Sequence, residues 1–325
     1  MASFIPLLVA QKSGLDREIP GRYELVIPSS FDDGVLAEAA KTANVLLGPY
    51  ISENILKNAS ELMLIQIPWT GLDTFNFSAV QSSDVLVCNT HSNSTAVAEM
   101  GISLLLDVLK KISYHDRKMR IGNWNRDGKD LDLTSKQLSD LTVCVLGCGN
   151  IGYKIAKIVN AFGSQVIAVD NNRKSDSVIG TVYSSDKMTD AIKSADVIIS
   201  ALPLTCETRG IINSDMIDNM KEGVVIINVS RAEIIVEDAL YSALCSGKVA
   251  GFASDVWWQT PKRGESESFP SAKFEFWKMH NVVMSPHRAG FIEGKLPHLD
   301  GAIDNIINLA NGRELLCKVD IHKQY

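Results

Sequence analysis

The stretch from Val143 to Ala156 has the sequence VCVLGCGNIGYKIA, in which an apolar run leads into a glycine-rich turn and then into an apolar helical pattern. Its glycines have the spacing G-x-G-x-x-G. In a dinucleotide site the first such glycine makes a tight turn, the second lets the backbone approach the phosphates, and the third packs the helix closely on the strand. Amides in the first turn of a helix lack internal partners and attract anions. The residues that we predict to hold a pyrophosphate lie in this turn: Gly147, Gly149, Asn150, Ile151 and Gly152.

The residues after the turn favour a dinucleotide site over an ordinary glycine-containing turn. Apolar residues continue at helical spacing, and a second short strand is expected at Gln165–Val169. Asp170 closes that strand 18 residues past Gly152, where a carboxylate accepts hydrogen bonds from the adenosine ribose and repels a 2′-phosphate. This arrangement favours NAD over NADP, although the nearby Arg173 and Lys174 partly offset the repulsion.

The composition excludes several classes of protein. The 325 residues suit two domains, and 32 basic against 38 acidic residues, with no basic run, argue against nucleic acid or an anionic membrane as partner. No apolar segment approaches membrane-spanning length, and the first one, Phe4 to Ala10, is too short for a secretory signal. The six cysteines show no metal-ligand spacing. We therefore expect reduced thiols, no metal site and a cytoplasmic location.

Short apolar runs in the first part of the chain alternate with helical patterns near residues 34–42 and 52–58, which predicts a parallel α/β layer. The expected strands are Phe4–Ala10, Tyr23–Ile27, Asn44–Leu47, Leu62–Ile67 and Val85–Cys88. The loop after the strand at Leu62 contains Trp69, Thr70 and Gly71, whose amides could bind a substrate carboxylate at a strand's carboxyl end. A plain connecting turn with Trp69 in the core is an equal alternative.

A long apolar helix is expected from Ala96 to Ile112, with Ser94 or Thr95 as its cap. Short strands at 195–201, 224–229 and 249–254 have the continuous apolar character of a sheet covered on both faces. The expected fold is α/β, with two Rossmann-like, doubly wound parallel-sheet domains and a cleft between them. A substrate domain would comprise residues 1–93 and 291–325, and an inserted NAD-binding domain would comprise residues 94–290.

Polar residues follow three of the expected strands. Arg231 comes after one strand, Asp255 after another, and His287 after the strand at Val282–Met284. Oxidation of a 2-hydroxy acid by a nicotinamide needs a cation for the carboxylate and a base for the hydroxyl proton. Arginine binds carboxylates through a planar fork, and histidine titrates near neutral pH. Arg231 and His287 are therefore the predicted catalytic and substrate-binding pair, and Asp255 could accept a hydrogen bond from the nicotinamide amide.

The chain resembles the D-2-hydroxyacid dehydrogenase family over nearly its whole length. The motifs LPLTCETRGII at Leu202, NVSRAEII at Asn228, GFASDVW at Gly251 and MSPHRAG at Met284 occur in the family's order. The resemblance implies that Arg231 and His287 bind substrate and transfer the proton, that Asp255 orients the nicotinamide, and that the protein is a homodimer formed largely through its nucleotide domain. Further residues assigned to the cofactor are Thr95, Leu202, Pro203, Thr208, Val229 and Ser230.

One position departs from the family's pattern. Family members usually carry a glutamate where this chain has Thr260, and that glutamate pairs with the catalytic histidine. Gln259 lies one residue before this position, and Glu265 and Glu267 could reach back to the histidine. The main hypothesis is an NAD-dependent oxidoreductase acting on a small 2-hydroxy or 2-oxo acid. The alternatives are a non-catalytic dinucleotide-binding regulator and a dehydrogenase of the same fold that uses formate or phosphite. The sequence specifies neither the substrate side chain nor the physiological direction.

Overall fold

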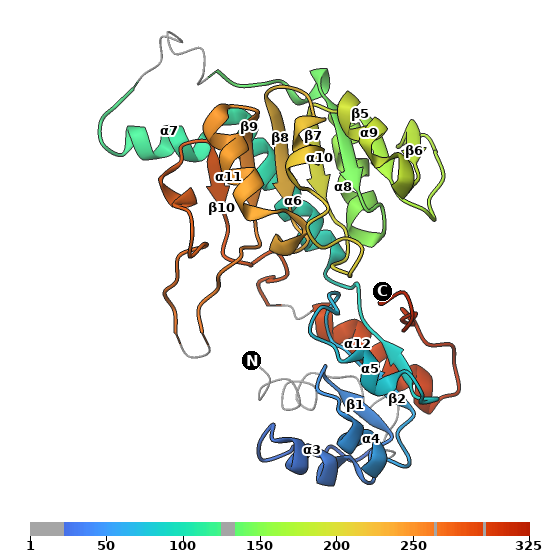
Figure 1. The fold of residues 1–325 in the computed structure, drawn as a ribbon. Helices are drawn as coiled ribbons and strands as arrows, with labels where there is room; N and C mark the ends of the chain where they lie inside the picture. Colours follow the sequence, from blue (N-terminus) through green and yellow to red (C-terminus); the bar gives the residue numbers. More distant parts are fainter. Residues whose placement is uncertain (1–22, 125–133, 263–264, 295–296) are drawn as a thin grey trace. The chain divides into compact units, whose positions relative to one another are not determined.

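The computed structural model describes residues 23–124, 134–262, 265–294 and 297–325. The chain divides into two compact units (Figure 1). The first unit contains Met1–Asn93 and Phe291–Tyr325, and the second contains Ser94–Gly290. The second unit is thus inserted in the sequence of the first, and the chain crosses between them twice. No helix within the described ranges is long and apolar enough to cross a membrane.

The second unit is built on a parallel sheet of seven strands with the order β10-β9-β8-β7-β4-β5-β6. The strands are β4 (Thr142–Leu146), β5 (Gln165–Val169), β6 (Thr181–Tyr183), β7 (Val197–Ser200), β8 (Val224–Asn228), β9 (Val249–Ser254) and β10 (Val282–Met284). The helices are α6 (Ser94–Lys110), α7 (Ile112–Met119), α8 (Asn150–Ala161), α9 (Met188–Ser194), α10 (Ser214–Asp218) and α11 (Glu237–Ser246). Short 3-10 turns lie at Leu138–Asp140, Ser185–Lys187, Ala232–Ile234 and Phe276–Lys278.

Helices cover both faces of this sheet, which confirms the doubly wound α/β prediction (Figure 1). On one face, α6 and α8 pack on alternate strand residues such as Val145, Ile199 and Ile227. On the other face, α9, α10 and α11 pack on the intervening residues, including Leu146 and Ile198. Strands buried on both faces need apolar residues at every position, which explains the continuous apolar runs. The strand order reverses beside β4, where open α/β sheets bind ligands.

The long helix predicted to reach Ile112 is interrupted. Helix α6 ends at Lys110, and Lys111 adopts a left-handed conformation with φ 55° before α7 begins. A left-handed residue breaks the helical hydrogen-bond ladder. The Asp107 carboxylate accepts hydrogen bonds from the backbone amide (2.8 Å) and the hydroxyl of Ser113, so a side chain of α6 caps the first turn of α7. The break is therefore stabilised by residues on both of its sides.

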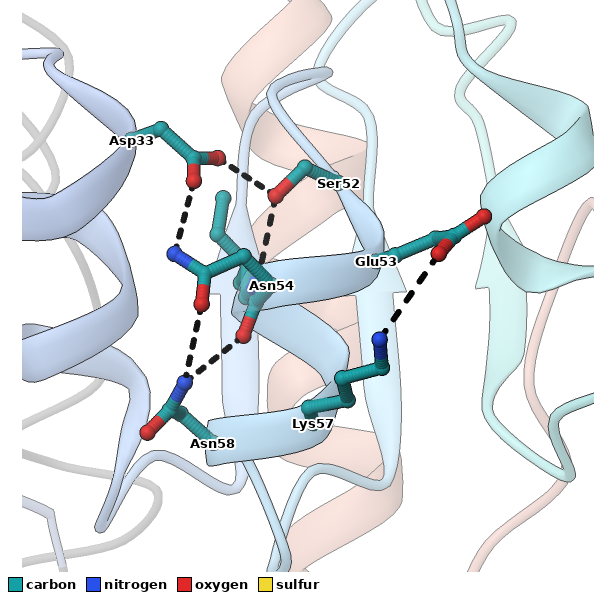
Figure 2. Close-up of polar contacts among 7 residues, drawn as sticks. Asp33, Ser52, Glu53, Asn54, Lys57 and Asn58 are labelled. Carbon is teal, nitrogen blue, oxygen red and sulfur yellow. Dashed lines mark hydrogen bonds and ion pairs between the residues drawn. The ribbon is translucent and has the colours of Figure 1, made fainter.

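The first unit contains a parallel sheet with the strand order β1-β2-β3. Its elements are α3 (Asp33–Ala40), β1 (Val45–Leu47), α4 (Glu53–Asn58), β2 (Leu64–Gln66), α5 (Phe77–Val80), β3 (Leu86–Cys88) and α12 (Pro297–Ala310). Figure 2 shows the polar contacts that join α3 to α4. The Asp33 carboxylate accepts from the Ser52 hydroxyl and from the Asn54 side-chain amide (2.7 Å), and the Ser52 oxygen caps α4 by accepting from the Ile55 amide (3.1 Å).

Helix α12 fixes the C-terminal segment to this first unit. The Asn305 side chain is fully buried and donates to Gln66 Oε1 (2.8 Å) and to the Leu316 carbonyl (2.8 Å). The Leu316 amide donates back to Asn305 Oδ1 (2.7 Å). Beyond it, Lys318 forms an antiparallel bridge with Cys88 at the end of β3. One buried amide side chain thus joins the sheet, the helix and the tail.

Two strands expected near the N-terminus need separate comment. Phe4–Ala10 lies outside the described residues. Tyr23–Ile27 is not a strand, so that prediction is wrong. Three consecutive side chains of this run, Leu25, Val26 and Ile27, are exposed. An apolar run forms a stable strand only where a neighbouring strand pairs with it and one face is covered; the described part of the chain provides neither here.

Candidate active site

The glycine-rich turn joins β4 to α8 and leaves room for a ligand at one of its three glycines. A Cβ at Gly147, whose φ is 80°, would lie 2.9 Å from the Ala201 carbonyl oxygen. A Cβ at Gly152 would lie 2.0 Å from the Gly147 carbonyl oxygen. Packing therefore requires glycine at both positions, whereas a Cβ at Gly149 would meet nothing within 4 Å. Because α8 begins at Asn150, its first-turn amides lie at this open space, which fits a pyrophosphate.

Asp170 is bound to the glycine-rich turn. Its carboxylate accepts from the Cys148 amide (2.8 Å), the Asn172 amide (2.8 Å) and the Arg173 amide (2.9 Å). Arg173 Nε donates to the Cys148 carbonyl (2.8 Å), and its guanidinium lies 3.9 Å from the Tyr153 ring centroid. Burial raises the pKa of the Cys148 thiol to about 12, so the turn carries a neutral thiol. Asp170, which is predicted to bind the ribose, is therefore hydrogen-bonded to the turn that is predicted to bind the phosphates.

The loop after β7 borders the same turn. A Cβ at Gly147 would lie 3.1 Å from the Leu202 Cα, so this loop and the glycine-rich turn are in close contact. The Thr208 hydroxyl donates to the Pro203 carbonyl (2.6 Å) and accepts from the Thr205 amide (2.8 Å). Leu202 and Pro203 therefore lie beside the predicted cofactor site. Thr208 stabilises their loop through its hydrogen bonds to Pro203 and Thr205.

Arg231 follows β8 in a turn organised by Asn228. The Asn228 side chain is fully buried; its Nδ2 donates to the Arg231 carbonyl (2.9 Å), and its Oδ1 accepts from the Ser230 hydroxyl (2.7 Å) and amide (3.1 Å). Ser230 and Ser200 share a hydroxyl hydrogen bond of 2.9 Å, and the Val229 amide donates to the Ser200 carbonyl (3.2 Å). Arg231 Nη1 donates to the Ser230 carbonyl (2.8 Å). Arg231 is half-buried and belongs to a turn that these hydrogen bonds fix.

His287 follows β10 in an unusual backbone conformation. It is exposed and left-handed, with φ 55°, and such a conformation in a residue other than glycine persists only where its surroundings impose it. The Asp255 carboxylate, only 1% exposed at the end of β9, imposes it. This carboxylate accepts from the Ser285 hydroxyl, the Arg288 amide (2.9 Å) and the Ala289 amide (2.8 Å). Asp255 thus holds the loop on both sides of His287, a contact that the sequence did not suggest.

The tryptophan pair after β9 belongs to an aromatic cluster. Trp258 stacks on Phe276 with 5.4 Å between ring centroids, and Trp257 packs edge-on against Phe252. Trp257 Nε1 also donates to the Ser285 carbonyl (2.9 Å), which adds a further support to the His287 loop.

The residues near the position of the missing glutamate face away from the core. Thr260, Gln259 and Glu267 are exposed. The Glu265 carboxylate accepts from the amide of Lys262, three residues before it in the sequence (3.3 Å). Glu265 thus has a backbone partner close to it in the sequence.

In the first unit, the predicted substrate loop follows β2. The Thr70 hydroxyl donates to the Thr90 carbonyl (2.9 Å), and the Asn89 side chain donates to the Thr70 carbonyl (2.9 Å). Trp69 is half-buried and packs on the core of this unit, as the alternative of a connecting turn required, while Gly71 remains half-buried beside it. The loop is therefore well fixed by its hydrogen bonds to Thr90 and Asn89.

The predicted cap of α6 has a different role. The structure places both Ser94 and Thr95 inside the first helical turn, and Lys154 Nζ donates to both hydroxyl oxygens at 2.7 Å. Thr95, assigned to the cofactor by the sequence, is exposed beside this ammonium.

The predicted residues of the second unit gather at one edge of its sheet. The glycine-rich turn, Asp170, the Leu202 loop, Arg231, Asp255 and His287 all follow the carboxyl ends of parallel strands. Residues 102–289 match the model of the NAD binding domain of D-isomer specific 2-hydroxyacid dehydrogenases. The chain belongs to this dehydrogenase family. Its members are NAD(P)-dependent oxidoreductases of 2-hydroxy acids, so the second unit contains an NAD-binding domain.

Individual relatives of the dehydrogenase family support the assignment. The chain is 30% identical over 272 residues to a glyoxylate reductase of Thermofilum pendens, an alignment that covers 82% of this chain and 77% of that protein. It is 29% identical over 267 residues to a D-3-phosphoglycerate dehydrogenase of Archaeoglobus fulgidus, covering 81% of this chain but only 48% of that longer protein. A solved structure of D-lactate dehydrogenase from Aquifex aeolicus, complexed with NAD and lactic acid, has a TM-score of 0.70 and 26% identity, covering 85% of this chain and 84% of that one.

Proposed function

We propose that this protein is an NAD-dependent oxidoreductase that transfers a hydride between nicotinamide and a small 2-hydroxy or 2-oxo acid. The observation that supports the proposal is that buried side chains fix the backbone at two residues, Arg231 and His287. Arg231 stands on a turn held by the buried Asn228, and His287 stands in a left-handed loop held by the buried Asp255. Both follow strands that end at the same sheet edge as the glycine-rich turn. Pre-organised cationic and acid–base groups beside a dinucleotide site are what this chemistry needs.

The cofactor would be held by the second unit. The amides that open α8 at Asn150 and Ile151 would bind the pyrophosphate, and Asp170 would accept from the adenosine ribose. Bound nicotinamide would supply or accept the hydride. Asp170 is also the reason to propose NAD rather than NADP, because a 2′-phosphate beside this carboxylate would be repelled.

Arg231 and His287 would act on the substrate. The Arg231 guanidinium would bind the carboxylate of a 2-oxo acid and polarise its carbonyl oxygen. During reduction, His287 as imidazolium would donate its proton to that oxygen while C2 receives the hydride; in the reverse direction, the neutral imidazole would remove the hydroxyl proton. The first unit would be the substrate domain, with the loop at Trp69, Thr70 and Gly71 contributing backbone amides to the carboxylate.

The proposed substrate is small. The named activities of the relatives, a glyoxylate reductase and a D-lactate dehydrogenase with lactic acid bound, support an acid of two or three carbons. A screen of NADH oxidation with glyoxylate, hydroxypyruvate, pyruvate and larger 2-oxo acids tests this proposal. Formate and phosphite, assayed for NAD reduction, serve as the contrasting donors. Turnover confined to formate or phosphite would contradict the proposed substrate class.

A second candidate is a dinucleotide-binding regulator with weak catalysis. It is favoured by the exposed Thr260 at the position of the family's glutamate and by the engagement of Glu265 with Lys262. Tight NADH binding in a calorimetric titration, without NADH oxidation by any 2-oxo acid, would support this candidate instead.

We propose a cytoplasmic location, because all six cysteines are free thiols. We further propose that the enzyme is a homodimer. The support is an apolar surface on α7 and the residues after it, where Ile112, Met119, Ile121 and Trp124 are 57%, 51%, 77% and 71% exposed. Exposed apolar side chains gathered on one short segment mark contact surfaces. Sedimentation at micromolar concentration should give a dimer for the native chain and a monomer for Ile121→Ser combined with Trp124→Ser. A monomeric native chain would refute the proposal.

A further inference from the structure

The first crossing between the units lies at Asn93 and Ser94, inside a segment that is fixed at both ends. We call residues 89–95 the connecting segment. On the side of the first unit, this segment is bound to the predicted substrate loop. The Thr70 hydroxyl donates to the Thr90 carbonyl (2.9 Å) and to Asn93 Oδ1 (3.2 Å), and Asn89 donates to the Thr70 carbonyl (2.9 Å). Hydrogen bonds therefore fix this segment to the substrate loop as far as Asn93, the last residue before the crossing.

On the side of the second unit, Lys154 holds the other end of the connecting segment. This residue belongs to α8, the helix that begins in the glycine-rich turn. Its ammonium donates to the hydroxyls of Ser94 and Thr95, both at 2.7 Å, and Ser94 is only 3% exposed. Hydrogen bonds from a charged donor are stronger than those between neutral groups. Among the described residues, no carboxylate forms an ion pair with Lys154 that would compete for its ammonium.

We propose that Lys154 is a positioning residue for the reaction proposed above: by fixing Ser94 and Thr95 to α8, it joins the substrate loop to the cofactor helix through a short segment of fixed length. The inference rests on the proposed function, because that reaction requires a substrate held with the help of one unit to meet a nicotinamide held by the other. Lys154 itself is assigned no contact with substrate or cofactor.

Loss of the Lys154 ammonium would allow a displacement between the two units that is large compared with the tolerance in the distance between reacting atoms. Ser94 and Thr95 form the start of α6, so the first turn would have to fray once Lys154 is lost. Unwinding these two residues from about 1.5 Å to about 3.5 Å per residue adds roughly 4 Å of reach to the crossing. A misplacement of only about 1 Å between reacting groups can reduce turnover about 10²-fold. The first-turn amides of α8 are untouched by this change, so binding of the dinucleotide should persist.

The test uses the full chain with Lys154→Met, which keeps the apolar length of the side chain and removes the ammonium. We expect kcat per NADH-binding site to fall by about 10- to 100-fold, with the NADH dissociation constant within about twofold of the native value. Amide hydrogen exchange should rise at residues 97–99, whose amides donate to the carbonyls of residues 93–95 in a helix that begins at Ser94. Lys154→Arg, which can still donate to both hydroxyls, should restore most of the turnover.

Lys157→Met is the matched control, because Lys157 lies three residues further along α8, is exposed, and has its ammonium 5.0 Å from the Tyr153 ring centroid. It should change neither turnover nor exchange at residues 97–99. If Lys154→Met does not fold, Ser94→Ala removes one of the two acceptors and should lower turnover in the same direction by a smaller factor.

The outcomes separate the two proposals. Native turnover in Lys154→Met, with faster exchange at residues 97–99, would overturn the positioning role and leave the proposed function intact. Parallel loss of NADH affinity, turnover and melting temperature would assign Lys154 a purely structural role. An inactive native enzyme would refute the proposed function, while the exchange measurement would still decide whether Lys154 fixes the segment.

Discussion

Replacement of Asp255 by alanine should both destabilise the second unit and disable His287. The carboxylate is 1% exposed and accepts from the Ser285 hydroxyl and from the amides of Arg288 and Ala289. The hydroxyl can turn to another acceptor, but the two amides cannot. A buried donor left without a partner costs about 1–3 kcal/mol. The Ala289 amide is buried and the Arg288 amide is partly buried, so the two together give about 2–5 kcal/mol. Removing a buried charge returns part of this amount, and a net loss of about 2–4 kcal/mol is expected.

The effect on turnover should exceed what the loss of stability alone produces. His287 is left-handed with φ 55°, a conformation that costs about 1–3 kcal/mol and needs support from its surroundings. Without Asp255 the loop should relax and carry the imidazole away, which should reduce kcat by about 10²-fold or more. Urea unfolding measures the first effect and steady-state NADH oxidation by folded protein measures the second. Ser285→Ala, which removes one hydrogen bond, is the control and should cost about 1–2 kcal/mol. An Asp255→Ala enzyme with near-native stability and turnover would refute the reasoning.

Three further predictions concern the cofactor turn and the thiols. Gly152→Ala should prevent stable folding of the turn, because its Cβ would lie 2.0 Å from a carbonyl oxygen, whereas Gly149→Ala should fold normally and weaken NADH binding; equal melting temperatures for the two would contradict this. Asp170→Ser should narrow the difference between the NAD and NADP dissociation constants, and an unchanged ratio would show that Asp170 does not face the ribose. At pH 8 the thiols whose pKa burial raises to about 11 or 12 are neutral and should resist alkylation until the protein unfolds, namely Cys88, Cys144 and Cys148. Mass spectrometry should therefore find native labelling confined to Cys206, Cys245 and Cys317.

The sheet of the second unit was accessible to sequence reasoning because its strands are covered on both faces. Such strands are largely apolar, and the stretch at Val249–Ser254, which is buried at all but one position, was predicted with the bounds that the structure shows. The break at Lys111 was not accessible, because a left-handed lysine has no sequence signal and the Asp107 side chain that caps α7 belongs to the preceding helix. The strand predicted at Tyr23–Ile27 was wrong because the sequence shows the apolar residues of this run but does not show whether a neighbouring strand pairs with it.

At the candidate site, residue type and position could be predicted, but the supporting contacts could not. Polar residues after apolar strands pointed to Arg231, Asp255 and His287. Asp255 accepts from both amides after His287. This contact depends on how the loops after β9 and β10 pack together, which the spacing of residues in the sequence does not indicate. Asn228 was visible only as the start of a motif, although its side chain orders the Arg231 turn. Lys154 lay in the quoted stretch without any sign that it reaches Ser94 on another helix.

The most direct test of the proposed reaction is the kcat of NADH-dependent glyoxylate reduction by the native chain and by His287→Asn, with NADH affinity measured on the same samples. We expect the native chain to turn over and His287→Asn to lose about 10²-fold or more in kcat, the usual scale for general acid catalysis, with an NADH dissociation constant close to the native one. Near-native turnover by His287→Asn would contradict the assignment of proton transfer to His287.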